Sequence, residues 1–239
     1  MFAANRLDTD ALVGKELPSV RRGSAADHAY KNLRERIVLF DLPPDEVLSR
    51  AQLSEELGVS LMPLREALQR LEKEGLVTII PQSKTYVNRI DSRKLESAHF
   101  LRMSLESEVV RRLTIAHSTE HMQRLCDTVG QQRNLIDLPE KVNDFHALDE
   151  LFHYQMFEAV GQPELHAMLA SQLANLARLR RLELPNKGKM EGVVQAHKAI
   201  IAGIRNGDVD EALSCLRADI SASISKVTKL KAQYPKYFF

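Results

Sequence analysis

The chain has 239 residues, a formal net charge of +1, and 44% hydrophobic but only 5% aromatic residues. This length favours two domains, and a composition rich in Leu, Ala, Glu, Arg and Lys favours helices over strands. The nearly neutral charge argues against indiscriminate nucleic-acid binding, so any contact with DNA must come from a few well-placed basic side chains.

The sequence indicates neither a membrane segment nor a disulfide framework. No run approaches the roughly eighteen consecutive apolar residues of a membrane helix, and acidic residues stand where a signal peptide would be apolar. We therefore expect a cytoplasmic protein without a membrane partner. Cys126 and Cys215 lie far apart and form no CxxC pair, so we expect two buried thiols.

Residues 1–23 show no clear periodicity and are predicted to be a mobile N-terminal arm that carries Arg21 and Arg22. A first helix is predicted over 27–40, because Tyr30, Leu33, Ile37 and Phe40 follow helical spacing. The LPPDE run at 42–46 ends it.

Two short helices joined by the sequence GVS follow this first helix. Ser49 is a good cap for the first of them, Gly58 permits the turn, and Ser60 is predicted to cap the second. After Gly75, the runs LVTII and TYVNRI are β-branched and are separated by a turn at 81–84. Three helices and a hairpin predict a winged helix-turn-helix over residues 24–90.

The second helix of such a motif enters the DNA major groove with its first residues. Its leading residues here, with the wing and the N-terminal arm, give the candidate contacts to double-stranded operator DNA: Ser60, Leu61, Met62, Arg65, Lys84, Arg21 and Arg22. Arg65 is the strongest candidate, since Arg can contact either phosphate or guanine. The alternative is a winged helix that serves protein contacts only.

The rest of the chain has a helical pattern, with breaks near 118, 138–139, 161–163, 185–188 and 207–208. These breaks predict six helices in an antiparallel bundle over 91–232, followed by a C-terminal tail at 233–239. The fold class is therefore mostly α. The arc of apolar residues on each helix should face the interior, so a polar residue inside that arc requires an explanation.

Several polar side chains fall inside these apolar arcs. Asp149 and His153 are one turn apart, His197 lies at the centre of an apolar face, and Asp219 is at the edge of another. Helical bundles build metal sites from inward side chains of this kind, and mixed nitrogen and oxygen ligands suit zinc, nickel or manganese. His99, Arg102 and Glu106 are also predicted to face inward.

The run LSEELGVSLMPLREALQRLEKEGLV resembles the signature of the GntR family of bacterial regulators, over about residues 27–90. The pattern of that family usually has Arg or a similar polar residue at Leu61, Thr at Met62, Arg at Ala51 and Gly at Lys84. These departures remove donors that the family uses on operator bases. The resemblance still implies a homodimer that binds operator DNA, most commonly as a repressor.

The second half resembles the FCD effector domain of the FadR-type branch, over about residues 93–232. This resemblance implies one Asp and three His as metal ligands. Asp149, His153 and His197 match three of them, and Asp219 replaces the remaining His. Because Asp can also ligate, we expect a divalent metal ion at these four residues.

The same resemblance implies that Arg102 lies near the metal and that the effector is a small organic acid. Glu106 and His99 are further candidates for the effector pocket. Gln172, on the inward face of a helix predicted at 164–182, could add polar contacts, as could Asn175 and Arg180 at the margins of that face. Ordinary packing or a solvated edge is the favoured alternative for these three residues. An ion pair between Arg102 and Glu106 within one helix is the alternative for those two residues. The basic cluster at 178–181 is interpreted as a solvated face.

Three function classes remain open at this point. The first is a regulator, expected from the family resemblance to be a repressor, whose operator affinity changes when a small acid binds. The second is a regulator with a purely structural metal or none, and the third is a metal-dependent hydrolase. The sequence contains no serine nucleophile elbow and no P-loop, so we expect no enzyme.

Overall fold

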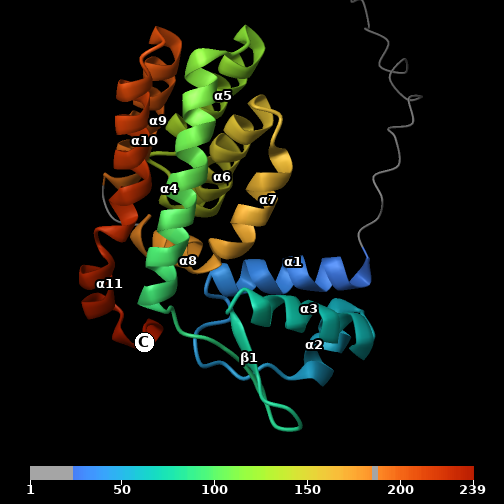
Figure 1. Ribbon diagram of the computed structural model, residues 1–239. Helices are drawn as coiled ribbons and strands as arrows, with labels where there is room; N and C mark the ends of the chain where they lie inside the picture. Colours follow the sequence, from blue (N-terminus) through green and yellow to red (C-terminus); the bar gives the residue numbers. More distant parts are fainter. Residues whose placement is uncertain (1–23, 185–187) are drawn as a thin grey trace, which may run out of the picture.

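The structure is a computed structural model that describes residues 24–184 and 188–239. The predicted arm at 1–23, with Arg21 and Arg22, lies outside the described residues. Figure 1 shows a bundle of long helices with α1, α2, α3 and the wing at one of its ends. None of the described helices is both long enough and apolar enough to cross a membrane.

Helix α1 (Ala25–Val38) begins two residues earlier than its apolar periodicity predicts. The reason is a capping box, in which the Ser24 side chain accepts from the Asp27 amide and Asp27 accepts from the Ser24 amide. The following turn contains Phe40 with a φ of 65°, so the chain leaves the helix sharply.

Helices α2 (Arg50–Leu57) and α3 (Leu61–Lys73) form the helix-turn-helix. Ser49 caps α2 through its side chain, and Gly58 ends it with a φ of 62°, a conformation that favours glycine. Ser60 occupies the N-cap position of α3, but its side chain makes no capping hydrogen bond. The prediction of a Ser60 side-chain cap is therefore wrong.

The wing consists of β1 (Val77–Ile79) and β2 (Thr85–Val87), which pair antiparallel with Val77 opposite Val87. Val47 forms a bridge to Tyr86, so the segment before α2 extends this small sheet. Leucines and valines from all of these elements make the core of this half: Leu33, Leu48, Leu53, Leu64, Leu68, Leu71, Leu76, Val77 and Val87.

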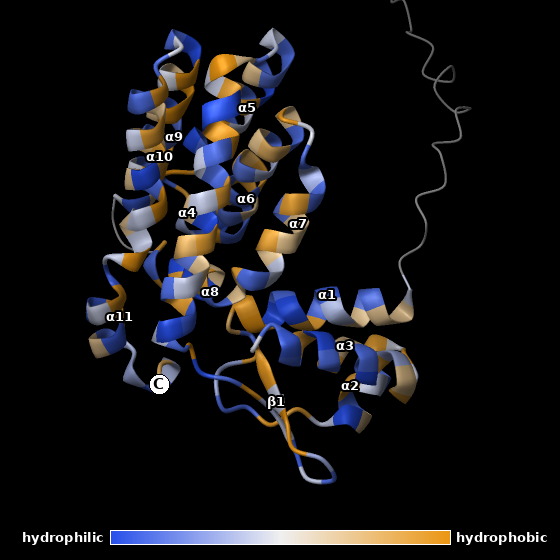
Figure 2. Ribbon diagram, viewed as in Figure 1, coloured by the Kyte–Doolittle hydropathy of each residue, from blue (hydrophilic) through white to orange (hydrophobic). Residues whose placement is uncertain are grey.

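The second half contains the helices α4 (Ser92–Ile115), α5 (Thr119–Arg133), α6 (Val142–Ala159), α7 (Pro163–Gln172), α8 (Ala174–Glu183), α9 (Lys189–Asn206), α10 (Val209–Ile224) and α11 (Val227–Gln233). Short 3-10 turns span Pro139–Lys141 and Pro235–Tyr237. Helix α10 packs on α4 and α9, and α5 packs on α6 and α9. Figure 2 shows hydrophobic and hydrophilic residues interleaved along these helices, as expected of amphipathic helices around a core.

This half differs from the predicted six helices at two places. The single helix expected at 164–182 is divided at Leu173 into α7 and α8, and the last helix is divided into α10 and α11. The break at Leu173 turns the chain so that Ala174, at the start of α8, packs into the core of the winged helix. A tertiary contact therefore overrides a continuous helical pattern.

The two halves meet around Arg178, whose side chain is completely buried. Its Nη1 donates to the Asn88 carbonyl at 2.9 Å, and its guanidinium lies 5.3 Å from the centre of the Phe40 ring. Phe40 also stacks on Tyr237 with ring centres 4.9 Å apart. The end of the chain thus packs against the junction, where the Ile90 amide donates to the Tyr237 carbonyl.

Candidate functional site

The first candidate site is the exposed face of α3 beside the wing. Leu61 and Met62 are 60% and 64% exposed, although both are large and apolar. Such residues at the start of a recognition helix can contact the methyl groups of thymine bases. Ser60 and Arg65 are exposed on the same first turns. The four predicted residues of α3 therefore share one solvent-facing surface.

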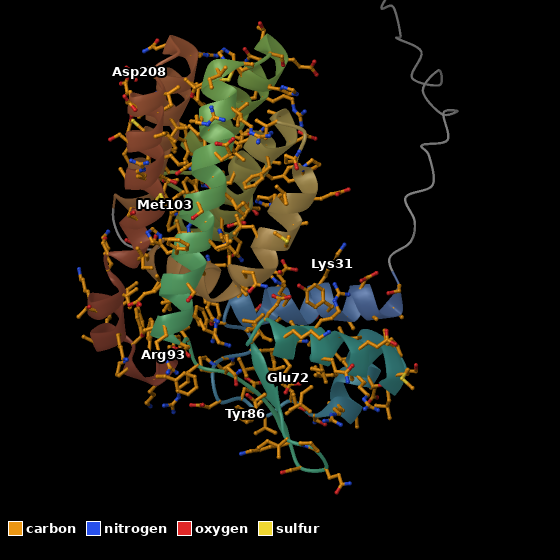
Figure 3. All side chains as sticks on the ribbon, viewed as in Figure 1. Lys31, Glu72, Tyr86, Arg93, Met103 and Asp208 are labelled. Atoms are coloured by element: carbon orange, nitrogen blue, oxygen red, sulfur yellow. The ribbon has the colours of Figure 1, made fainter. Side chains whose placement is uncertain are left out.

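A groove of about 550 Å³ separates α3 from the wing, and its walls include Arg50, Arg65, Gln69 and Gln82. The wing is held relative to α3 because the Ile79 amide donates to the Glu72 carboxylate at 2.9 Å. Figure 3 labels Glu72 and Tyr86 in this region, where α3 lies beside the wing. The recognition helix and the wing therefore form the two walls of one continuous surface groove.

Basic side chains at this face differ in their partners. Arg70, also on α3, binds Asp27 at 2.6 Å and lies 3.8 Å from the centre of the Tyr30 ring, so it is occupied within the protein. Lys84 lies over the Tyr86 ring at 5.4 Å and remains exposed. Sequence reasoning missed Arg50, which lies in the groove and donates to the Thr85 hydroxyl at 3.3 Å.

The second candidate site is a buried cluster in the centre of the bundle. Helix α6 supplies Asp149 and His153, α9 supplies His197, and α10 supplies Asp219. Ligand atoms of Asp149, His153 and His197 all lie within 4.8 Å of one another. The Nε2 of His153 lies 3.6 Å from Asp219 Oδ2, and the Nε2 of His197 lies 3.6 Å from Asp149 Oδ1. The structure thus brings together the four residues predicted as ligands.

Each imidazole is oriented by a partner on its outer nitrogen. The Nδ1 of His197 donates to the Gln132 side-chain oxygen at 2.9 Å, and the Nδ1 of His153 lies 2.8 Å from the Glu106 carboxylate. The Phe152 ring stacks on His197 at 3.8 Å between ring centres. Such partners fix the tautomer of a metal-binding histidine and leave its other nitrogen free.

The chemistry of the donor set fits a divalent metal ion. Both Nε2 atoms and Asp149 Oδ1 are buried and make no hydrogen bond to any part of the chain that the structure describes, although buried polar atoms normally have a partner. Burial lowers the pKa of His197 to about 4, which keeps the imidazole neutral at physiological pH. Neutral imidazoles and carboxylates are the forms that bind metal.

Charges around the cluster are tightly paired. Arg102 and Glu106 are both buried and form an ion pair at 2.7 Å within α4. Burial raises the pKa of Glu106, but the positive charge of Arg102 and the contact with His153 outweigh it and lower this pKa to about 2. The ion pair predicted as an alternative for Arg102 and Glu106 is therefore present, and Glu106 also orients His153.

Arg180, which the sequence placed only at the margin of the effector pocket, contacts one of the predicted metal ligands. Its guanidinium contacts Asp149 Oδ2 and lies 3.5 Å from Glu150, and its side chain is mostly buried. Arg178 is completely buried as well, so the prediction of a solvated face at 178–181 is wrong. The error arises because α8, which begins after the break at Leu173, has eight of its ten residues buried and so presents little surface to solvent.

The other predicted pocket residues have separate places. Gln172 is exposed at the end of α7, and Asn175 is buried at the junction, where it accepts from Arg178 at 3.3 Å. The predicted inward placement of Gln172 is therefore wrong. Asn175 makes its hydrogen bond with Arg178 and not with a residue of the cluster. His99 is half-buried on α4, and burial followed by the charge of Arg102 lowers its pKa. Cys126 and Cys215 are only partly buried.

A cavity of about 370 Å³ between α9 and α10 has Asp219 in its wall. Two lysines, Lys189 and Lys226, line it. The small residues of the lining keep it open: Gly188, Gly192, Ala196, Ala218 and Ala222. Both lysines also contact the buried Glu183, at 3.1 and 2.6 Å. This cavity therefore reaches one of the four predicted ligands, Asp219.

Comparison with known proteins adds to this geometry. The family model described as "FCD domain" matches residues 98–222, and that described as "Bacterial regulatory proteins, gntR family" matches residues 25–87. An uncharacterized HTH-type transcriptional regulator in an unstable DNA locus of Streptomyces ambofaciens is 30% identical over 210 residues, which is 87% of each chain. The HTH-type transcriptional repressor RspR of Escherichia coli is 28% identical, over 83% of this chain and 88% of its own.

Solved structures show the same fold. Escherichia coli McbR/YncC aligns with a TM-score of 0.74 at 18% identity, over 87% of this chain and 99% of its own. The crystal structure of a putative GntR transcriptional regulator from Rhodococcus aligns with a TM-score of 0.69 at 16% identity, over 87% and 99%. At these identities the likeness concerns the fold alone.

Proposed function

Because this chain belongs to the GntR family of bacterial regulatory proteins and is a transcriptional regulator with an FCD domain, we propose that it is a metal-dependent sensor of a small organic acid. In this proposal residues 24–90 bind operator DNA and residues 91–232 bind the acid. The protein acts as a repressor, and acid binding changes its affinity for the operator. Its relatives are transcriptional regulators and not enzymes.

The DNA contacts proposed are those of the recognition helix and the wing. Arg65 is exposed beside the groove, and Lys84 is exposed on the wing, so both can reach a duplex. Leu61 and Met62 stand where the family usually has polar residues. An apolar pair at this position favours operators with thymine methyl groups at the contacted bases.

The metal proposal rests on one observation above all, the buried and unpaired Nε2 atoms of His153 and His197 facing two carboxylates. Asp149, His153, His197 and Asp219 would hold the ion. A bound divalent ion would supply a Lewis-acidic centre on which the oxygen of an organic acid can bind. Zinc, nickel and manganese are the candidates. Because Asp219 is a carboxylate where a three-histidine site would have an imidazole, the site should bind oxygen-preferring ions more readily than a three-histidine site does.

Arg180 supports an acid as the effector. Its guanidinium contacts Asp149 and is positioned to share a carboxylate with the metal, since Arg binds carboxylates through paired hydrogen bonds. Arg102 pairs with Glu106, whereas Arg180 pairs directly with the proposed ligand Asp149, so Arg180 is the closer of the two arginines to the proposed metal position. The cavity beside Asp219 gives the acid a route inward.

Helix α8 offers a physical connection between the acid site and the DNA-binding half. Arg180 contacts Asp149, while Arg178 on the same helix donates to the Asn88 carbonyl just after β2. A shift of α8 on acid binding would therefore move a group that holds the end of the wing. We propose a homodimer, in which this shift changes the spacing of two winged helices on adjacent half-sites.

The test begins by selecting genomic fragments that the protein binds and measuring affinity by fluorescence anisotropy at fixed salt. Metal-loaded protein is then titrated with hydroxy acids, sugar acids and dicarboxylates. We expect one acid class to change operator affinity about tenfold or more. Asp149→Ala should bind the operator but ignore the acid. An operator affinity that no acid changes would contradict the sensor proposal and would leave a regulator with a structural metal.

A further inference from the structure

A second groove lies between α5 and α9, on a part of the bundle that the proposed function does not use. Its volume is about 420 Å³, and four residues of α5 and five of α9 line it: Cys126, Val129, Gly130, Arg133, Lys198, Ile201, Ala202, Arg205 and Asn206. None of these residues belongs to the candidate metal cluster. The two helices pack directly against each other.

The pairing of the helices places the basic residues at opposite ends of the groove. Gln132 contacts His197, and Arg205 Nη2 lies 3.1 Å from Cys126 Sγ, so α5 and α9 run antiparallel. Arg133 and Lys198 are next to the first contact, and Arg205 makes the second. Seven residues of helix separate these two ends, a distance of about 10 Å along the helix axis.

The three basic side chains are exposed, and within residues 24–184 and 188–239 none of them has a carboxylate within ion-pair distance. The middle of the groove is apolar, because Val129, Ile201 and Ala202 contribute its lining. Two positive ends and an apolar middle match a ligand that carries negative charge at both ends of an apolar chain.

Gly130 keeps the middle of the groove open. It lies inside α5 and has an ordinary helical conformation, yet a Cβ added at this position would meet nothing within 4 Å. Glycine inside a helix is less favourable than alanine. Among the residues that the structure describes, no turn and no close packing requires this glycine, whereas a ligand lying along the groove would.

We propose that the groove between α5 and α9 binds a linear dicarboxylate of medium chain length, with Arg133 and Lys198 at one carboxylate and Arg205 at the other. The apolar chain of the ligand lies over Val129, Gly130 and Ile201. The site faces away from the metal cluster, because Gln132 and His197 meet between the two. It is therefore a binding site in addition to the proposed acid sensor and does not depend on it.

Isothermal titration calorimetry with three acids tests the proposal. Azelate has two carboxylates and a medium apolar chain, nonanoate has the same chain length but one carboxylate, and glutarate has two carboxylates too close together to reach both ends. We expect azelate to bind about tenfold more tightly than either, because only azelate contacts both basic ends. Equal binding of azelate and nonanoate, or no binding of azelate, overturns the proposal.

Two sets of variants locate the site. Gly130→Leu places side-chain atoms in the groove at a position where an added Cβ meets nothing within 4 Å. It should abolish azelate binding while the melting temperature stays the same or rises. Gly192→Leu is the matched control, since Gly192 also has open space and lines the other cavity, beside Asp219. Arg205→Gln should reduce azelate to the affinity of nonanoate. Azelate binding that survives Gly130→Leu but is lost in Gly192→Leu overturns the proposed location.

The same titration with Asp149→Ala separates this site from the metal-dependent sensor. Azelate should bind this variant as it binds the wild type, whatever the metal content. Loss of azelate binding in Asp149→Ala would place the ligand at the metal cluster and would contradict a separate groove.

Discussion

The Nδ1 of His197 donates to the Gln132 side-chain oxygen at 2.9 Å, across the contact between α9 and α5. This hydrogen bond fixes the neutral tautomer of His197 with its Nε2 facing Asp149 and Asp219. Both side chains are completely buried, so water cannot replace the bond. Gln132 therefore positions a proposed metal ligand without touching the metal.

Replacing Gln132 by Leu should lower metal affinity about tenfold to a hundredfold, because the orientation of His197 is no longer fixed. Competition with a chromogenic chelator measures this affinity. Thr128→Val is the matched control on the same helix, since the Thr128 hydroxyl donates to Gln155 at 3.0 Å, away from the ligands. An equal loss of metal affinity in both variants would mean that general packing, and not His197, is responsible.

Arg65→Ala should weaken operator binding by about 1–3 kcal/mol, because it removes a donor from the first turns of the recognition helix. Arg70→Ala is the control on the same helix, since Arg70 binds Asp27 and Tyr30 within the protein. It should destabilise the winged helix and leave operator affinity nearly unchanged. A loss of affinity in Arg70→Ala, but not in Arg65→Ala, would place the DNA on the other face of α3.

Gly203→Ala should destabilise the effector half by about 1–3 kcal/mol. A Cβ at Gly203 would lie 2.8 Å from the backbone of Ala212, so α9 and α10 would have to move apart. Gly192→Ala on the same helix meets nothing within 4 Å and should stabilise by up to about 1 kcal/mol. Urea unfolding measures both, and equal effects would contradict the close approach of these two helices.

Glu183 should make stability depend on acid pH. Burial raises the pKa of this carboxyl. The hydrogen bonds and charges of Lys226, Ser223 and Lys189 lower it by more, so its pKa lies below the ordinary 4.5. A lowered pKa gives stability that is present above about pH 4.5 and is lost as the pH falls through the folded value.

Glu183→Gln should therefore cost about 1–2 kcal/mol at pH 7, an amount limited by the exposure of Lys226. The difference from the wild type should shrink as the pH is lowered below 4.5. Urea unfolding at a series of pH values gives both free energies. A difference that stays constant down to the lowest pH at which the wild type folds would show that the ion pairs of Glu183 contribute nothing.

The sequence predicts the parts of this fold that depend on local signals. Gly58 ends α2 in the left-handed conformation expected of a turn residue, and the β-branched runs around residue 82 form the wing. His197 and Asp149 could be placed inward because a polar residue in an apolar arc stands out. Once the helices pack, these residues meet.

The errors arise where packing between distant segments decides the outcome. No glycine or proline lies near Leu173 to indicate a break in the helix. As a result, the expected exposures of Gln172 and Arg178 are reversed: Gln172 is exposed and Arg178 is buried. Gln132 escaped notice because a single glutamine on a polar helix has no distinguishing pattern. Its role depends on a partner 65 positions away in the chain.

The most direct test of the account is the number of metal ions per chain, measured by elemental analysis of protein purified without chelator, beside Asp149→Ala and His197→Ala. The account predicts close to one ion in the wild type and none in either variant, each still folded by circular dichroism. Folded wild-type protein that binds no zinc, nickel or manganese, even after these ions are added, would contradict it.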